Sequence, residues 1–119
     1  MKKLAARFYQ TPNTNMPVRE WLLALPSGDR RIIGADIATV EFGWPIGMPI
    51  CKSVKGGLWE IRSSIRNGRV EARLYFAIDD DNAILLHGHE GKDSQSREIG
   101  LARLRWSDYM SRKRKDLKP

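Results

Sequence analysis

The chain has 119 residues, enough for one domain with a hydrophobic core and too few for two, so we expect a single domain over residues 1–119. Its formal net charge of +7 favours a polyanionic partner: nucleic acid, an anionic membrane surface or an acidic protein. Cys51 is the single cysteine, which excludes an internal disulfide, and no apolar run approaches membrane-spanning length. We therefore expect a cytoplasmic protein that does not insert into membranes.

The first half of the sequence predicts one strand and two helices. Residues 4–9 are short, partly alternating and aromatic at their end, which indicates a strand. Pro17 suits the first turn of a helix, and four apolar residues then follow helical spacing: Val18, Trp21, Leu22 and Leu25. A break at residues 26–29 separates this helix from a second, whose apolar stripe is Ile33, Ile37 and Val40. Residues 43–57 are rich in Gly and Pro and predict a loop.

Two alternating stretches, residues 57–65 and 70–78, predict the two strands of a β-hairpin. Between them lies Arg66-Asn67-Gly68-Arg69, and Asn-Gly favours a type I′ turn, which needs positive φ at both central residues. The turn sets the register of the hairpin. The expected pairs are Ile65 with Val70, Ile61 with Leu74 and Trp59 with Phe76 on the core face, and Arg62 with Arg73 on the polar face.

The pairing of Arg62 with Arg73 is the most informative feature of the chain. Like charges directly opposite on a sheet are destabilising, by some fraction of roughly 1 kcal/mol. A sequence that keeps both cations on an open polar face has another use for them, such as binding a phosphate. The alternative is that Glu60 and Glu71 neutralise the arginines as ordinary surface ion pairs, which contribute little.

A further central strand is expected from Ala83 to His89, and two registers are possible. A loop of even length before it puts His87 on the core face opposite Leu74. An odd loop has Asn82 in the left-handed region, which Asn tolerates, and we favour this alternative. It predicts these neighbours: His87 beside Tyr75, and His89 beside Arg73.

The last predicted element is a helix, which Ser94 or Ser96 can cap. Its apolar residues share one face: Ile99, Ala102, Trp106, Tyr109 and Met110. Residues 112–119 form a basic tail. The order β-α-α-β-β-β-α indicates an α+β domain, with helices packed on one face of an antiparallel sheet and a polar, cationic face left open.

The chain resembles phage-derived HigB-type toxins of the RelE/ParE superfamily over nearly its whole length. The order and spacing of several segments carry this resemblance: Phe8-Tyr9 and residues 16–22, 43–49, 57–62, 72–76 and 85–88. It implies the RelE-like fold and the toxin of a type II toxin–antitoxin system, which cleaves mRNA on the ribosome and is bound by a helix-turn-helix, HigA-like antitoxin. The alternatives are a non-catalytic inhibitor such as the ParE branch, which acts on gyrase, and a nucleic-acid-binding module of the same fold.

The resemblance also implies roles for three basic residues. Arg73 matches the strand arginine that contacts the scissile phosphate, and Arg62 matches a basic position on the neighbouring strand. Lys92 matches a basic position just after the last strand. The sequence departs from the family pattern after His87-Gly88, where two adjacent lysines are often found.

Cleavage of this kind needs no metal or cofactor. The ribose 2′-hydroxyl attacks the adjacent phosphorus while a base, an acid and fixed cations assist. Arg62 and Arg73 suit the cationic role, because guanidinium stays charged and offers a planar fork to phosphate oxygens. Glu60, on the same face, is a candidate general base, or else it compensates the charge of the arginines. His87 is a candidate acid or base, or else a packed strand residue beneath the helices.

Four other residues are candidates for binding RNA. Lys52 and Lys55 can follow the RNA backbone, although a solvated loop is the alternative for both. Tyr75 on the polar face can stack on a base. His89 is expected near solvent, where it can contact RNA. We expect no metal site, because the two histidines and the cysteine fall short of the usual four ligands.

Overall fold

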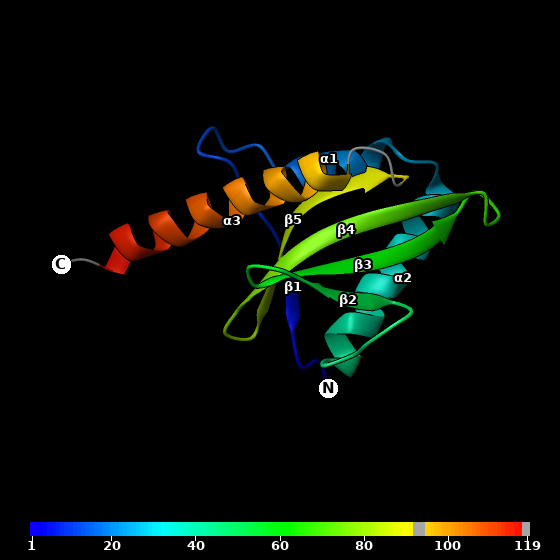
Figure 1. The fold of residues 1–119 in the computed structure, drawn as a ribbon, viewed down its shortest axis with the longest axis horizontal. Helices are drawn as coiled ribbons and strands as arrows, with labels where there is room; N and C mark the ends of the chain where they lie inside the picture. Colours follow the sequence, from blue (N-terminus) through cyan, green and yellow to red (C-terminus); the bar gives the residue numbers. More distant parts are fainter. Residues whose placement is uncertain (92–94, 118–119) are drawn as a thin grey trace.

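The computed structural model describes residues 1–91 and 95–117 and has an α+β fold, as predicted. In chain order the elements are β1 (Ala5–Phe8), α1 (Pro17–Ala24), α2 (Ser27–Gly43), β2 (Cys51–Val54), β3 (Leu58–Ile65), β4 (Val70–Asp79), β5 (Asn82–Glu90) and α3 (Gln95–Leu117). One twisted sheet forms the centre of the domain, and α3 runs out beyond it toward the C-terminus (Figure 1).

The five strands lie in the order β1-β5-β4-β3-β2, and the sheet is mixed rather than antiparallel. Its edge strand β1 pairs in parallel with β5, whereas the other neighbours are antiparallel. The prediction of a loop throughout residues 43–57 was wrong, because β2 lies within it. Gly56 and Gly57 both adopt positive φ, at 83° and 81°, which lets the chain reverse and pair Cys51–Val54 with the start of β3.

The predicted register of the β3–β4 hairpin is confirmed. Its pairs include Ile65 with Val70, Ile61 with Leu74, Trp59 with Phe76 and Arg62 with Arg73. Asn67 and Gly68 have positive φ of 54° and 82°, as the predicted turn requires. Arg66 also has positive φ, at 50°, and the Gly68 N–H donates to the Ile65 carbonyl at 3.1 Å, so two turns overlap in this connection.

The strand β5 has the register that we favoured, but an odd loop with Asn82 in the left-handed region does not produce it. Asp79 pairs with Asn82, so the loop is even, and Asp80 rather than Asn82 takes the left-handed conformation, with φ of 52°. A β-bulge follows in β5. Phe76 pairs with Leu85 and Tyr75 pairs with His87, so Leu86 between them has no partner in β4. The bulge gives the final neighbours: His87 beside Tyr75, and His89 beside Arg73.

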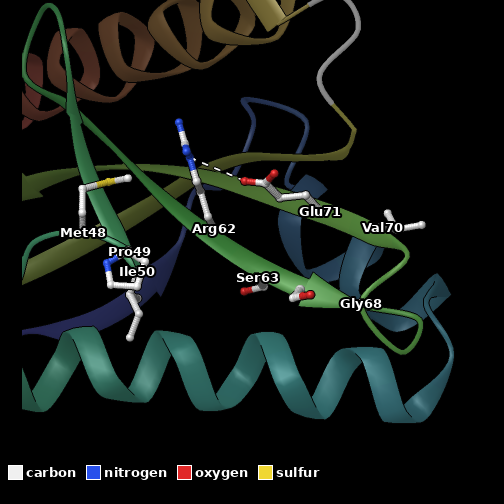
Figure 2. A pocket seen from close by; sticks show the side chains of 9 residues that line it. Met48, Pro49, Ile50, Arg62, Ser63, Gly68, Val70 and Glu71 are labelled. Carbon is white, nitrogen blue, oxygen red and sulfur yellow. Dashed lines mark ion pairs between the residues drawn. The ribbon is translucent and has the colours of Figure 1, made fainter.

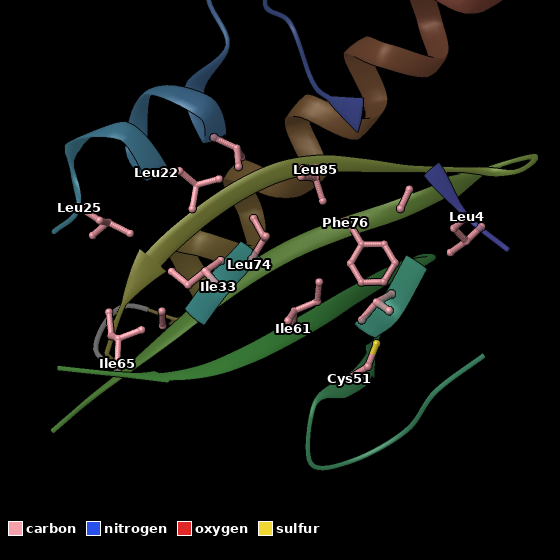
Figure 3. Close-up of a cluster of buried hydrophobic side chains, with 14 residues drawn as sticks. Leu4, Leu22, Leu25, Ile33, Cys51, Ile61, Ile65, Leu74, Phe76 and Leu85 are labelled. Carbon is pink, nitrogen blue, oxygen red and sulfur yellow. The ribbon is translucent and has the colours of Figure 1, made fainter. Parts of the chain in front are cut away.

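Helices cover both faces of the sheet, so the prediction that all helices pack on one face was wrong. The main core lies between the sheet and α1 with α2, and Figure 3 shows its side chains meeting from these elements. A second core lies under α3. It consists of Tyr9, Leu58, Tyr75, Ala77, Ile84, Leu86 and Ala102. The face that carries the arginines is therefore apolar along part of its length, and α3 covers that part.

Gly88 of β5 allows α1 to approach the sheet. A Cβ atom added there would lie 2.4 Å from the ring of Trp21. We expect Gly88→Ala to lower the free energy of unfolding by about 1–3 kcal/mol, because the indole must move out of a packed core. Urea denaturation measures this effect. The matched control is Gly34→Ala in α2, where no atom lies within 4 Å of the added Cβ, and helix propensity predicts a gain of about 0.5–1 kcal/mol. Equal stability of the Gly88 variant and the parent would contradict the packing of Trp21 on β5.

Candidate functional site

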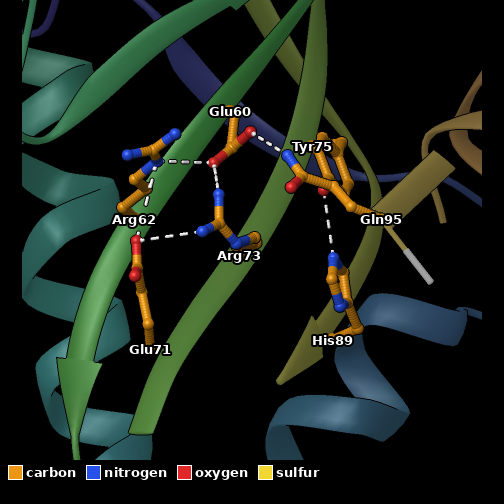
Figure 4. A network of polar contacts seen from close by, with 7 residues as sticks. All are labelled: Glu60, Arg62, Glu71, Arg73, Tyr75, His89 and Gln95. Atoms are coloured by element: carbon orange, nitrogen blue, oxygen red, sulfur yellow. Dashed lines mark hydrogen bonds and ion pairs between the residues drawn. The ribbon is translucent and has the colours of Figure 1, made fainter. Parts of the chain in front are cut away.

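The carboxylate of Glu60 is the centre of a buried polar cluster on the α3 side of the sheet (Figure 4). One oxygen, Oε1, accepts hydrogen bonds from Arg62 Nε at 2.7 Å and from Arg73 Nη1 at 2.5 Å. The other, Oε2, accepts from Gln95 Nε2 at 3.4 Å. The cluster therefore joins β3, β4 and the first residue of α3.

Glu71 supplies a second carboxylate to the same arginines. Its Oε1 lies 3.6 Å from Arg62 Nε and 3.5 Å from Arg73 Nη2. Each guanidinium thus contacts two carboxylates, which offsets the repulsion between the paired arginines. These are not ordinary surface ion pairs, because the Glu60 and Arg73 side chains are only 1% and 3% exposed. Removing one partner of such a buried pair is costly, since a buried charge is left without compensation.

The two arginines differ in their access to a ligand. Arg73 is buried, and its Nε has no hydrogen-bond partner among the residues that the structure describes. The expectation that its side chain lies on an open polar face was wrong, because the side chain is only 3% exposed and lies between the Glu60 and Glu71 carboxylates. Arg62 is a quarter exposed. Its closest contacts with both carboxylates use Nε rather than a terminal nitrogen (Figure 4).

Tyr75 and His89 form the neighbouring part of the cluster. The Tyr75 hydroxyl and His89 Nε2 are 3.0 Å apart, and their rings stack with centroids separated by 5.6 Å. Burial raises the pKa of Tyr75 to about 12, so the phenol stays protonated. The prediction that Tyr75 is open to stack on a base was wrong, because its side chain is fully buried. His89 is also buried rather than near solvent.

His87 lies on the same face and is held by α3. Its Nε2 is 2.7 Å from Glu98 Oε2, and Arg105 Nη1 lies 3.1 Å from its Nδ1. A guanidinium only donates, so Nδ1 is the acceptor and Nε2 carries the proton that Glu98 accepts. Burial lowers the pKa of His87 more than the Glu98 carboxylate raises it, which favours this neutral form. His87 therefore lies under α3, as the packing alternative has it, and its role as an acid or base stays a prediction.

The predicted lysines lie in different places relative to this cluster. Lys52 is exposed on the edge strand β2, where it is the register neighbour of Glu60 in β3. Lys55 is exposed in the following turn, where its carbonyl accepts a hydrogen bond from Arg103 Nη2 at 2.7 Å. Lys52 is therefore beside the cluster, whereas Lys55 lies at the opposite end of β2, next to Arg103 of α3. Lys92 lies outside the described residues.

The sequence analysis missed three polar residues of α3 that contact the site: Gln95, Glu98 and Arg105. They were recognisable in principle, because at helical spacing they fall on the same face as the apolar residues Ile99, Ala102, Trp106 and Tyr109. Polar side chains within an otherwise apolar helical face need buried partners. Their partners in the sheet are Glu60, His87 and the Leu86 carbonyl.

Two kinds of feature are absent from the described part of the chain: a group of side chains that could hold a metal ion, and a helix that could span a membrane. Within residues 1–91 and 95–117, no three His, Cys, Asp or Glu side chains gather closely enough to hold a metal ion. None of the helices over these ranges is both long and apolar enough to cross a membrane.

The sheet, its three helices and the arginine cluster define a small α+β protein compatible with the RelE-like fold. Residues 20–106 match the family model described as "Phage derived protein Gp49-like (DUF891)", and the chain belongs to this toxin-like family. The match extends from α1 into α3 and includes every residue of the Glu60 cluster. No curated protein matches the chain.

The balance of charge in the cluster predicts a large effect of Glu60→Gln. This change leaves the buried Arg73 guanidinium beside a neutral amide, and we expect a loss of about 3–5 kcal/mol in the free energy of unfolding. Chemical denaturation at neutral pH measures it. Glu71→Gln is the matched control, because that side chain is a third exposed and lies farther from both arginines, so the loss should be at most about 1 kcal/mol. Equal losses would show that Glu60 has no central role.

The lowered pKa of His87 predicts a pH dependence of stability. Below its ordinary pKa of 6.5 the unfolded chain protonates this histidine, while the folded protein does so only at lower pH. The unfolded state then binds more protons, so stability falls as pH decreases below about 6.5. We expect the loss of unfolding free energy between pH 7.5 and 5.5 to be smaller in His87→Gln than in the parent. Urea denaturation at both pH values tests this, and an unchanged or larger loss in the variant would contradict it.

Proposed function

We propose that this protein is the toxin of a type II toxin–antitoxin pair and cleaves mRNA on the ribosome, as a HigB-like endoribonuclease. Membership of a phage-derived, toxin-like family supports the toxin role. The observation that carries the nuclease role is Arg62, a quarter-exposed arginine whose closest contacts with Glu60 and Glu71 use Nε and not the fork of terminal nitrogens. A guanidinium fixed in this way is preorganised to bind a phosphate through its fork.

In the proposed reaction, the 2′-oxygen forms a bond to phosphorus and the bond from phosphorus to the 5′-oxygen breaks. The products are a 2′,3′-cyclic phosphate and a free 5′-hydroxyl. A base accepts the proton of the 2′-hydroxyl, and an acid donates a proton to the leaving oxygen. Arg62 binds the non-bridging phosphate oxygens and stabilises the charge that develops on them.

The other residues of the cluster take supporting roles in this proposal. Glu60 and Arg73 are positioning residues, because each is buried and bonded to the other. We assign one proton transfer to His89, which lies beside Arg73 in register and contacts the Tyr75 hydroxyl. The second proton-transfer group is His87 or Lys92.

The partners of the proposed toxin are mRNA, the ribosome and a helix-turn-helix, HigA-like antitoxin in the cytoplasm. The exposed side chains of Lys52 and Lys55 suit contact with RNA backbone, and the net charge of +7 supports attraction to a polyanion. This attraction weakens with rising salt, because bound counterions are released from the RNA.

One observation favours a different activity, that of a non-catalytic inhibitor like the ParE branch. Two of the candidate proton-transfer groups, Glu60 and His89, are buried, so neither of them is presented to solvent. An inhibitor of gyrase needs a binding surface rather than exposed proton-transfer groups. The two activities are separated by what happens to transcripts and to DNA in cells.

The proposal predicts the effect of Arg62→Ala in cells that express the chain without a partner. Brief induction of the parent should arrest growth and produce discrete cuts within translated mRNA, mapped by primer extension. Arg62→Ala should reduce cutting by about 100-fold, the typical effect of losing one preorganised transition-state donor. Arg31→Ala in α2 is the matched control, because it removes one exposed arginine away from the cluster. Growth arrest with intact transcripts and damaged DNA would instead support the gyrase inhibitor.

A further inference from the structure

A groove lies beside the Glu60 cluster, at the outer edge of β3 (Figure 2). Its volume is about 450 Å³, within the range of about 300–1,000 Å³ found for small-molecule sites. It runs between the segment that precedes β2 and the start of β4. The lining residues are Met48, Pro49, Ile50, Arg62, Ser63, Ser64, Gly68, Val70 and Glu71.

The walls of the groove differ in chemistry. Met48, Pro49 and Ile50 form an apolar wall, and Figure 2 shows them across the groove from Val70. Met48 is 59% exposed, so much of its apolar surface meets solvent. Walls of this kind suit a flat ligand, whose two apolar faces they would contact from either side.

The floor of the groove includes an open edge of the sheet. Pairing of β2 with β3 ends at Ile61, and the Arg62 N–H makes the last bond across this edge, to the Ile50 carbonyl at 2.9 Å. Alternate residues of a strand direct their N–H and C=O groups to the same side. The N–H and C=O of Ser64 therefore face the groove, and they have no backbone partner within the described ranges.

Arg62 belongs to both the groove and the cluster. It lines the groove while Glu60 holds its Nε. Glu71 likewise lines the groove and contacts the arginines through a single oxygen, Oε1. A ligand with a phosphate at Arg62 and a flat, hydrogen-bonding group in the groove would use all of these features.

We propose that the groove binds the base of an RNA nucleotide whose phosphate is bound by Arg62. This inference rests on the proposed function and names a determinant of its specificity. The apolar walls stack on the faces of the base, while the Ser64 backbone and the Glu71 carboxylate contact its edge. A carboxylate only accepts hydrogen bonds. Glu71 therefore favours adenine, cytosine and guanine, which carry an exocyclic amino group, over uracil, whose single donor N3–H lies between two carbonyl oxygens that repel a carboxylate.

The test measures binding of short single-stranded RNA whose 2′-hydroxyls are methylated, which blocks cleavage. Fluorescence anisotropy compares an oligonucleotide that has an adenine at the central position with one that lacks the base there. Removing the base should weaken binding to the parent protein at least about fivefold, a typical effect of losing one stacked base. The Ser64 amide resonance should shift with the base-bearing RNA and not with the abasic one.

Substitutions complete the test. Met48→Ala should remove most of the advantage of the base-bearing RNA, and Leu23→Ala is the matched control, because it truncates another half-exposed apolar side chain outside the groove. Glu71→Gln should reduce the preference for adenine over uracil at the central position. Thermal denaturation of each variant verifies that it is folded.

The outcomes separate the two proposals. If the parent binds no RNA at low salt and cuts none in cells, the proposed function fails and the inference fails with it. If the parent binds and cuts RNA but the abasic oligonucleotide and Met48→Ala make no difference, only the groove assignment is overturned. Displacement of the Ser64 amide resonance by an extended peptide, with no effect of RNA, would overturn it in favour of strand addition by a protein partner.

Discussion

The sharing of one buried carboxylate by two arginines is the constraint on which the site depends. Arg62 and Arg73 face each other across the hairpin, and without Glu60 their repulsion would oppose the pairing of β3 with β4. Because Glu60 binds one arginine through Nε and the other through Nη1, the two guanidiniums are held differently. One is fixed beneath the surface and the other is presented at its edge.

The helix α3 has two roles that a purely apolar helix could not combine. Its apolar residues cover the second core, and its polar residues reach Glu60 and His87 within the same face. α3 therefore contacts the site from above the sheet. The Arg73 guanidinium is buried, and an ion without a partner is strongly disfavoured in a protein interior. This burial makes the cluster sensitive to the loss of a single partner.

The sequence predicted the features that depend on local chemistry. Asn67-Gly68 determines a turn without help from the rest of the fold, so the register of the hairpin and the opposed arginines followed from it. The bulge at Leu86 could not be predicted, because nothing in the alternation of β5 marks the point at which the register shifts. Alternation places Arg73 and Tyr75 on one face of a strand, but it does not reveal that α3, at the other end of the chain from β1, packs over Tyr75 on that face. The short strand β2 carries too few residues for a periodic signal.

The parallel pairing of β1 with β5 orders events during synthesis of the chain. Ala5–Phe8 leaves the ribosome early, yet its partner in the sheet begins only at Asn82. The edge strand must wait until most of the protein has emerged, and such long-range pairing is slow to form. The Glu60 cluster waits longer still, since Gln95 arrives with α3. A nascent chain therefore lacks the completed Glu60 cluster until Gln95 has left the ribosome.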